Sequence, residues 1–378
     1  MEQTLASGDE WKRTDPEDVG VDSDALRSAV EYALCTGTPP KDVAYDFSNT
    51  HPWTEEEAEL GYGALGPMPD RRGGPAGIVL KDGRPIAEWG DVTRVDHTFS
   101  VAKTFLGIVA GIAWDRDLID SVDDPVADYV DDGGFESPQN ADITWRQLLQ
   151  GTSEWEGTLF DRPDSVDRNR PVGRDPDAVG EAGQRELREP GTYWEYNDVR
   201  INRLALALLR LWKKPLDRVL AHEVMEPIGA SGRWEWHGYY NSSVLVDGER
   251  MVSVSGGGHW GGGLWISARD LARVGQLLLD GGTWGDRQLL SQEWIDMMTE
   301  PCPINDDYGF LVWLNEGNQW PSAPQSSYAA FGFGRNIVWI DPEDDTVAVL
   351  RWLAPDEGDD WSNLDRFFES LLSAIDDR

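Results

Sequence analysis

Ser100 and Lys103 stand three residues apart, directly before an apolar segment that covers residues 104–114. Positions i and i+3 of a helix lie on the same face, so a helix here places the serine hydroxyl beside the lysine amine. A serine hydroxyl is a weak nucleophile until a neighbouring base removes its proton. Partial desolvation at the start of an apolar helix favours the neutral amine, which can be that base. The pair predicts nucleophilic attack by Ser100, provided that other segments complete a site.

Two further segments contain groups that could complete it. Residues 190–198 read Pro-Gly-Thr-Tyr-Trp-Glu-Tyr-Asn-Asp, and residues 330–332 read Ala-Phe-Gly. Together with Ser100-x-x-Lys103 and the glycine-rich stretch 257–263, they resemble the motifs of the serine β-lactamase and penicillin-binding-protein superfamily. The likeness begins at about residue 19 and places the chain on the branch of class C β-lactamases, related esterases and 6-aminohexanoate-dimer hydrolases.

The resemblance implies a serine hydrolase that forms an acyl-enzyme and uses no metal or other cofactor. Ser100 would attack a carbonyl carbon, while Lys103 and Tyr196 share the proton transfers. A tyrosine serves as a base only where a nearby ammonium stabilises its phenolate, and Lys103 is the candidate cation. The backbone N–H groups of Ser100 and Phe333 would hold the oxyanion. The candidate substrate-binding residues are Asn197, Asp198, Trp260, Ala330 and Gly332.

Two residues depart from the family's pattern. The third place of the Tyr-x-Asn motif is Asp198, unless Asn197 carries the amide one position earlier. Ala330 stands where lactamases and penicillin-binding proteins have a lysine or histidine that helps to bind the substrate's carboxylate. We therefore expect the substrate to be a small ester or amide. A true β-lactamase or D-amino-acid peptidase is one alternative, and a non-catalytic ligand-binding member of the fold is the other.

The elements that must position these residues come from both ends of the chain. An Asp-Gly turn between apolar runs predicts a β-hairpin over residues 77–89, and a second hairpin is predicted over 336–352. The pattern of residues 115–259 is helical and rich in loops. This order predicts an α+β, β-lactamase-like fold, in which a central antiparallel sheet from both chain ends is flanked by helices and carries a helical inserted lobe.

The expected domain organisation follows from this pattern. Residues 1–18 are predicted to be a loose lead-in to one hydrolase domain over residues 19–378. Its α/β lobe would comprise about 19–114 and 260–378, and its helical lobe about 115–259. The charged segment 161–188 is expected to be a surface loop over the cleft.

For several side chains near the motifs, the sequence is compatible with more than one role. His259 could line the cleft or simply be satisfied in a tight turn, whereas His97 is expected to be structural. Trp155, Trp194 and Trp260 are candidates for an apolar wall beside the substrate.

The composition limits the partners and the compartment. The chain has 33 Lys and Arg against 69 Asp and Glu, a net charge of −36 that argues against nucleic acid and anionic membranes as partners. This excess resembles that of proteins from extreme halophiles, whose surfaces are screened by salt. Cys35 and Cys302 do not form a disulfide framework. The chain shows neither a signal peptide nor a membrane span, so we expect a cytoplasmic protein of unknown oligomeric state.

Overall fold

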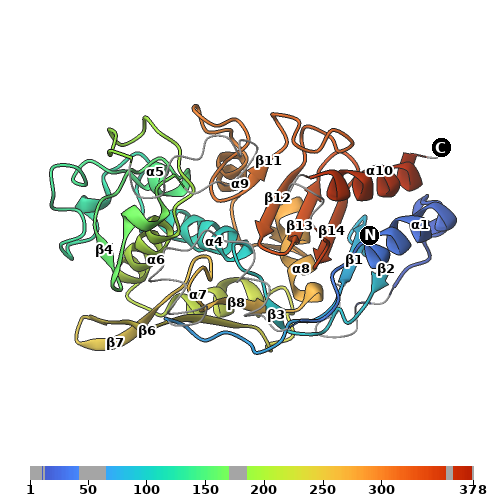
Figure 1. The fold of residues 1–378 in the computed structure, drawn as a ribbon, viewed down its shortest axis with the longest axis horizontal. Helices are drawn as coiled ribbons and strands as arrows, with labels where there is room; N and C mark the ends of the chain where they lie inside the picture. The colour runs from blue at the N-terminus through green and yellow to red at the C-terminus, as the bar shows by residue number, and fades with distance from the viewer. Residues whose placement is uncertain (1–10, 12, 42–64, 170–184, 355–360, 377–378) are drawn as a thin grey trace.

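The computed structural model describes residue 11 and residues 13–41, 65–169, 185–354 and 361–376 of the 378-residue chain. A six-stranded and a four-stranded antiparallel sheet, two short two-stranded sheets and the helices around them form the described part (Figure 1). Most of the predicted lead-in and residues 170–184 of the predicted surface loop lie outside the described residues.

The larger sheet is built from both ends of the chain, as predicted. Its six strands run in the order β11-β12-β13-β14-β1-β2, so the N-terminal hairpin joins the C-terminal strands through β1 and β14. This pairing runs antiparallel from Ala76 opposite Arg351 to Lys81 opposite Thr346. The strands are β1 (Ala76–Lys81), β2 (Arg84–Trp89), β11 (Trp313–Leu314), β12 (Tyr328–Gly332), β13 (Asn336–Asp341) and β14 (Thr346–Arg351).

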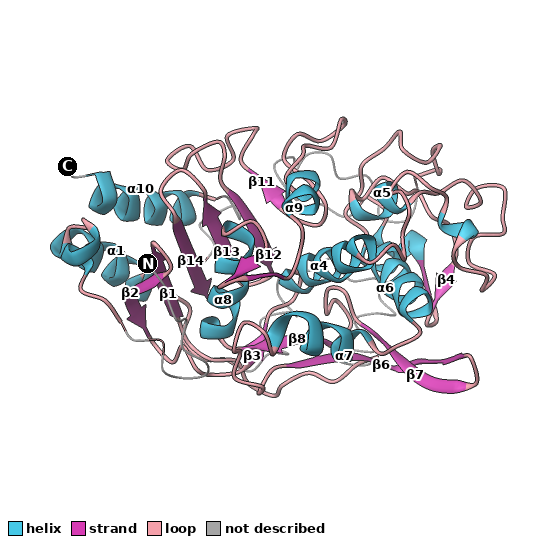
Figure 2. Cartoon of the chain, turned by 180° about the vertical axis from the view of Figure 1, so that it is seen from behind, coloured by secondary structure: helices cyan, strands magenta, loops and turns pink. Residues whose placement is uncertain are grey.

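Helices cover both faces of this sheet (Figure 2). On one face, Phe368 of α10 (Ser362–Asp376) stacks on Trp339 of β13 at 4.6 Å, and α1 (Ser23–Cys35) packs beside α10. On the other face, α8 (Ala268–Leu279) lies against β13, β14 and β1. Successive side chains of a strand point to opposite faces, so the sheet is buried between two layers of helix.

The smaller sheet corrects one prediction. Its strands run in the order β3-β8-β6-β7, and the hairpin of β6 (Glu235–Val246) and β7 (Glu249–Val254) lies within the segment expected to be helical. The prediction was wrong there because the alternation of apolar residues is interrupted where the register shifts between Gly238 and Ser243. The other two strands are β3 (Asp96–His97) and β8 (Gly263–Ile266).

Helix α4 (Val101–Asp115) is the most buried element near the motifs. Its residues from Val101 to Ala113 are all buried, and it packs on α6 (Asp198–Trp212), α9 (Gln292–Met298) and β12. The remaining elements are η2 (Pro16–Val19), η3 (Val126–Asp128), α5 (Trp145–Leu149), β4 (Thr158–Leu159), β5 (Arg162–Pro163), η4 (Asp164–Asp167), α7 (Leu216–Leu220), η5 (Ala221–Met225), β9 (Thr283–Trp284) and β10 (Arg287–Gln288).

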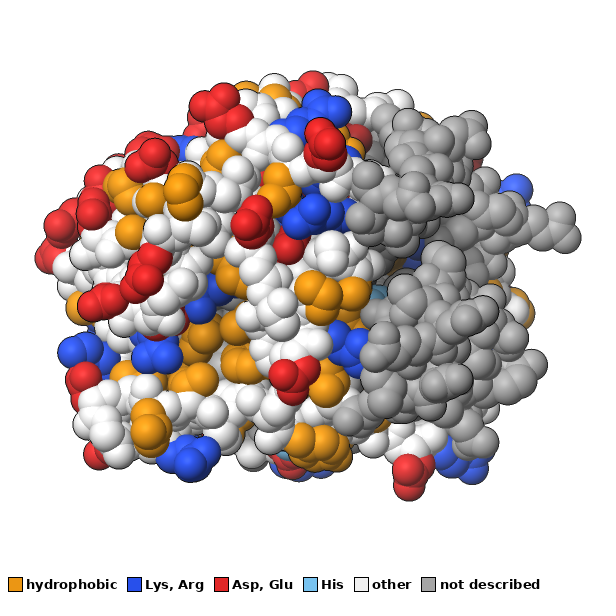
Figure 3. Space-filling model, turned by 60° about the vertical axis from the view of Figure 1, so that its left-hand side comes forward, with side chains coloured by type: hydrophobic (Ala, Val, Ile, Leu, Met, Phe, Trp, Pro, Cys, Tyr) orange, Lys and Arg blue, Asp and Glu red, His pale blue; other side chains and the backbone are white. Residues whose placement is uncertain are grey.

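On the face seen in Figure 3, acidic side chains are scattered over the described residues, with basic side chains among them. None of the helices in the described ranges combines the length and the apolar composition needed to cross a membrane.

Candidate active site

The chain turns sharply just before Ser100. Phe99 has a φ of 53°, a left-handed conformation that is costly for a bulky side chain and that is often found at functional sites. The Phe99 ring is held edge-on by Phe333 at 5.4 Å and by Trp352 at 6.1 Å. Ser100 then occupies the N-cap of α4 but makes no capping hydrogen bond with its side chain. Its half-buried hydroxyl is therefore available to a partner other than the helix backbone.

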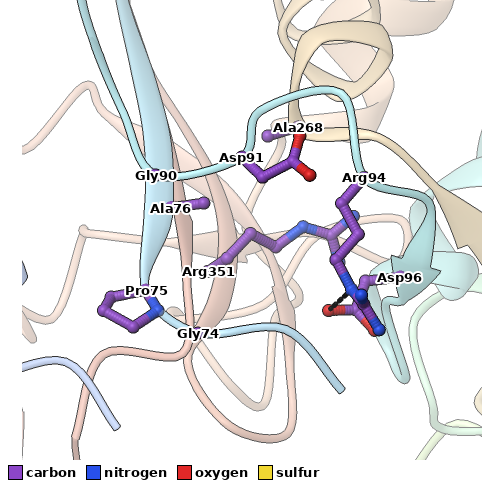
Figure 4. A pocket seen from close by; sticks show the side chains of 9 residues that line it. All are labelled: Gly74, Pro75, Ala76, Gly90, Asp91, Arg94, Asp96, Ala268 and Arg351. Atoms are coloured by element: carbon purple, nitrogen blue, oxygen red, sulfur yellow. Dashed lines mark ion pairs between the residues drawn. The ribbon is translucent and has the colours of Figure 1, made fainter. Parts of the chain in front are cut away.

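Buried polar contacts hold the strand that leads to Ser100. Asp96 Oδ2 accepts hydrogen bonds from Gly73 N at 2.7 Å and from Trp352 Nε1 at 3.1 Å, while Arg351 Nη1 donates to His97 O at 3.2 Å. Figure 4 shows Arg94 reaching Asp96 at the edge of a cavity of about 220 Å³. Neither Ser100 nor Lys103 lines this cavity, so it is separate from the candidate active site.

His97 is a buried structural side chain, in agreement with the prediction. Its Nε2–H donates to Gly262 O at 2.7 Å. Burial lowers the pKa of His97 from 6.5 to about 3, although the hydrogen bond to Gly262 opposes this shift. The imidazole therefore stays neutral in the folded protein at pH values where it is protonated in the unfolded chain.

This difference predicts a loss of stability in acid. Because the folded-state pKa of His97 lies below 6.5, its contribution to stability is complete above pH 6.5 and falls as the pH drops toward 3. Between pH 7 and pH 4, we expect about 3 kcal/mol of the decrease in unfolding free energy to come from His97, at 1.36 kcal/mol per pH unit. Urea unfolding at both pH values should show a smaller decrease for His97→Gln than for the wild type. Equal decreases would contradict this assignment.

Lys103 lies between Ser100 and a carboxylate. Its Nζ donates to Ser100 Oγ at 2.7 Å and forms a buried ion pair with Asp198 Oδ1. The side chains of Lys103 and Asp198 are only 2% and 4% exposed. The structure thus places the carboxylate of Asp198 next to the lysine that follows the candidate nucleophile.

Tyr196 is the third candidate catalytic residue, and it lies beside Lys103. Lys103 Nζ lies 4.5 Å from the centroid of the Tyr196 ring. This ring stacks on Trp313 at 5.7 Å and contacts Tyr308 at 6.3 Å. Burial raises the pKa of Tyr308 well above its usual value, so Tyr308 remains a neutral phenol. Trp313 and Tyr308 were missed in the sequence, where no spacing connects them with the tyrosine motif.

The structure separates the two candidates for the third place of the tyrosine motif. Asn197 caps α6, since its Oδ1 accepts from Val199 N at 3.1 Å and from Arg200 N at 3.2 Å. Its Nδ2 donates to Asp164 O, and the residue is 1% exposed. Asp198, the first residue of the helix, faces Lys103. Asn197 is therefore placed as the N-cap of α6, and its side chain is buried there.

The end of β12 lies against the nucleophile segment. A Cβ added to Gly332 would stand 2.0 Å from Thr98 O and 3.1 Å from Ser100 N, so only glycine fits there. Phe333 follows directly and packs on Phe99. Ala330, two residues earlier on the same face of the strand, is 5% exposed and opposite Val338. The structure thus brings Gly332, Phe333 and Ser100 together.

The three tryptophans that are candidates for an apolar wall beside the substrate differ in exposure. Trp260 is 2% exposed and packs edge-on against His259 at 4.3 Å, and Trp155 is 3% exposed. Both side chains are thus buried in the structure. Trp194 is half-buried and lies 6.3 Å from the Tyr196 ring, so it remains a candidate for the wall.

The described part of the segment 161–188 is not a simple surface loop. Asp164 and Asp167 of η4 are 3% and 1% exposed. Asp167 Oδ2 accepts from Asp198 N at 2.8 Å, while Asp164 pairs with Arg200 of α6. These carboxylates were missed because a charged, proline-bearing stretch is usually solvated.

The chain belongs to the Beta-lactamase family, whose sequence profile matches residues 66–361, and it is a serine hydrolase of that family. It is 25% identical to a 6-aminohexanoate-dimer hydrolase of Paenarthrobacter ureafaciens over 309 residues, which are 74% of this chain and 73% of that protein. Two solved structures share the fold. A family VIII carboxylesterase superposes with a TM-score of 0.58 at 16% identity, covering 94% of this chain and 99% of that one. A hydrolase with promiscuous acyltransferase activity superposes with a TM-score of 0.57 at 15% identity, covering 93% and 100%.

Proposed function

We propose that this protein hydrolyses a small ester or amide through an acyl-enzyme on Ser100. The observation that carries the proposal is the hydrogen bond of 2.7 Å between Lys103 Nζ and Ser100 Oγ, in a site that also contains the Tyr196 ring. Similarity to a 6-aminohexanoate-dimer hydrolase and to a carboxylesterase supports an amide or ester as the substrate.

The charge arrangement assigns the proton steps. Lys103 lies against Ser100 Oγ, Asp198 and the Tyr196 ring, and in the proposed mechanism it supplies the positive charge beside a phenolate on Tyr196. Tyr196 takes the Ser100 proton while the Oγ–carbon bond forms. It then gives this proton to the leaving oxygen or nitrogen as the bond between the carbonyl carbon and that atom breaks. Water then attacks the acyl carbon and gives a proton to Tyr196. The Oγ–carbon bond breaks, and the proton passes back to Ser100.

The negative charge that develops on the carbonyl oxygen requires donors near Ser100. The proposed donors are the backbone N–H groups of Ser100 and Phe333, one at the start of α4 and one just after β12. The tight packing of Gly332 on Thr98 supports this pairing because it brings the two chain segments together. The start of a helix adds a favourable dipole.

Substrate charge separates this proposal from a β-lactamase or D-amino-acid peptidase. Ala330 supplies no cation for a substrate carboxylate, and Asp198 adds a negative charge next to Lys103. Neutral esters and amides are therefore the expected substrates. We further propose that the enzyme is cytoplasmic and salt-adapted, on the basis of its net charge of −36.

Active-site labelling combined with a substrate panel tests the proposal. In molar KCl, a fluorophosphonate should label the wild type on the peptide that contains Ser100, as located by mass spectrometry. Ser100→Ala should not be labelled. The panel consists of a short-chain p-nitrophenyl ester, a linear amide dimer and a chromogenic cephalosporin, with Ser100→Ala as the control for each.

Ester or amide turnover that disappears in Ser100→Ala is the expected result. Cephalosporin turnover faster than either would indicate a lactamase instead. If the folded wild type is not labelled, the protein is a non-catalytic member of the fold.

A further inference from the structure

The end of β14 connects the two chain segments that would supply the oxyanion donors. One nitrogen of Arg351, Nη1, donates to His97 O at 3.2 Å and to Asn336 Oδ1 at 3.0 Å. His97 lies three residues before Ser100. Asn336 is the first residue of β13 and lies three residues after Phe333. The guanidinium group therefore joins the strand that leads to the nucleophile to the turn that carries the second proposed donor.

Asn336 links Arg351 to the backbone of Phe333. Its Oδ1 accepts from Arg351, while its Nδ2 donates to Phe333 O at 2.6 Å. The N–H and the carbonyl group of a residue are attached to the same Cα, so a hydrogen bond to the carbonyl also restricts the N–H. Asn336 is fully buried and Arg351 is 3% exposed, so these hydrogen bonds are shielded from water.

The guanidinium group of Arg351 is held from a third side as well. Its Nη2 donates to Ile266 O of β8, the strand that pairs with β3 in the four-stranded sheet. Burial lowers the pKa of Arg351 from 12.5 to about 10, so the group keeps all its N–H donors at neutral pH. Because these donors have a fixed planar geometry, the guanidinium group holds its acceptors at defined separations.

Trp352, the next residue, contacts the same two segments. Its φ of 61° is a left-handed conformation that is costly for a bulky side chain. Its Nε1 donates to Asp96 Oδ2 at 3.1 Å, and its ring lies edge-on to Phe99 at 6.1 Å. A Cβ added to Gly334 would lie 2.4 Å from this ring. Two successive side chains at the end of β14 thus contact both the segment before the nucleophile and the turn after β12.

We propose that Arg351 and Asn336 are positioning residues that fix the two oxyanion donors relative to each other. This inference rests on the proposed serine hydrolase function, because it requires an oxyanion site formed by Ser100 and Phe333. Both side chains act through the backbone and not on the substrate. Arg351 holds the strand before the nucleophile, and Asn336 holds the carbonyl of Phe333. A shift of either segment would separate the two N–H groups, and oxyanion stabilisation depends on their geometry.

Asn336→Asp tests the link to Phe333 with little change in side-chain shape. A carboxylate still accepts from Arg351, but it places an acceptor where Nδ2 donates to Phe333 O. We expect kcat for the p-nitrophenyl ester and the rate of fluorophosphonate labelling to fall by about 10- to 100-fold, somewhat less than for the loss of a whole oxyanion donor. KM should stay within about twofold of the wild type, since the lost interaction is one made in the transition state.

A double variant tests whether the two residues act together. Arg351→Met removes every donor of the guanidinium group and should lower both rates by a similar factor. If the residues act through one connection, Arg351→Met with Asn336→Asp should react within about threefold of the slower single variant, and not at the product of the two effects.

The matched control for the loss of a buried arginine is Arg203→Met. Arg203 lies on α6, is 2% exposed and pairs with Asp132 at 2.7 Å. This variant should unfold at a lower urea concentration than the wild type, but both of its rates should stay within about twofold of the wild type. Urea unfolding of every variant thus separates a loss of stability from a loss of rate.

The possible outcomes separate this inference from the proposed function. Rates for Asn336→Asp within about threefold of the wild type, or effects that multiply in the double variant, would overturn the positioning role. An equal loss of rate in Arg203→Met would overturn it too, because the cause would then be a general loss of stability. If the wild type is labelled but hydrolyses none of the panel, the proposed ester or amide hydrolysis fails, and the labelling rates still decide the positioning role. A wild type that cannot be labelled overturns both.

Discussion

Replacing Lys103 by methionine is expected to lower kcat by about 10³-fold and to lower the unfolding free energy by about 3 kcal/mol. The first effect follows from the lost ammonium beside Ser100 Oγ and Tyr196, since proton-transfer groups contribute 10²- to 10⁴-fold. The second follows because the carboxylate of Asp198, at 3% exposure, loses the ammonium group that lies against it. Ester hydrolysis and urea denaturation measure the two effects on the same preparations.

A double variant separates catalysis from stability. Lys103→Met with Asp198→Asn removes both charges of the ion pair, so it should recover most of the unfolding free energy while staying inactive. If it is as unstable as Lys103→Met alone, the ion pair is not the source of the lost stability. If Lys103→Met keeps more than a tenth of the wild-type kcat, Lys103 has no part in proton transfer.

Gly332→Ala is expected to lower kcat by at least about 10²-fold, comparable with the loss of one oxyanion donor. The added methyl group would stand 2.0 Å from Thr98 O, a backbone atom that cannot move without displacing Ser100. The end of β12 would therefore shift away from the nucleophile, and the N–H of Phe333 with it. The labelling rate by fluorophosphonate and kcat for the ester report this change.

Gly74→Ala is the control for the added methyl group. There the new Cβ would meet the Pro40 ring at 3.1 Å, outside the candidate active site, and activity should be retained. A Gly332→Ala variant that is labelled at the wild-type rate would show that the end of β12 contributes nothing to the oxyanion site.

Local signals predicted much of the fold. Asp22 is of a residue type that favours helix N-caps, and its Oδ1 accepts from Asp24 N and Ala25 N at the start of α1. The Asp82-Gly83 turn joins β1 to β2, as predicted. The β6–β7 hairpin also has an Asp-Gly turn, at 247–248, but the shift in register along β6 obscured the pattern of alternation that would have supported it.

Only those contacts of the candidate site that join residues of one sequence motif could be predicted. Ser100 and Lys103 are neighbours on one helix, so their contact follows from their spacing. The contact of Asp198 with Lys103, and of His259 with Asp167, depends on how α6, η4 and the glycine-rich loop pack in three dimensions. No local pattern specifies such packing, and a charged residue in a polar stretch gives no sign that it will be buried.

The pairing of β1 with β14 has a consequence for how the protein is made. The contact between Ala76 and Arg351 joins residues far apart in the sequence, and such non-local pairings slow folding. A ribosome releases the N-terminal hairpin and α4 long before β12, β13 and β14. During synthesis the apolar helix α4 therefore lacks the late strand β12 on which it packs. Exposed apolar surface of this kind makes a chain prone to aggregate. Ser100 emerges early, but the surroundings that would activate it are assembled only when the last strands leave the ribosome.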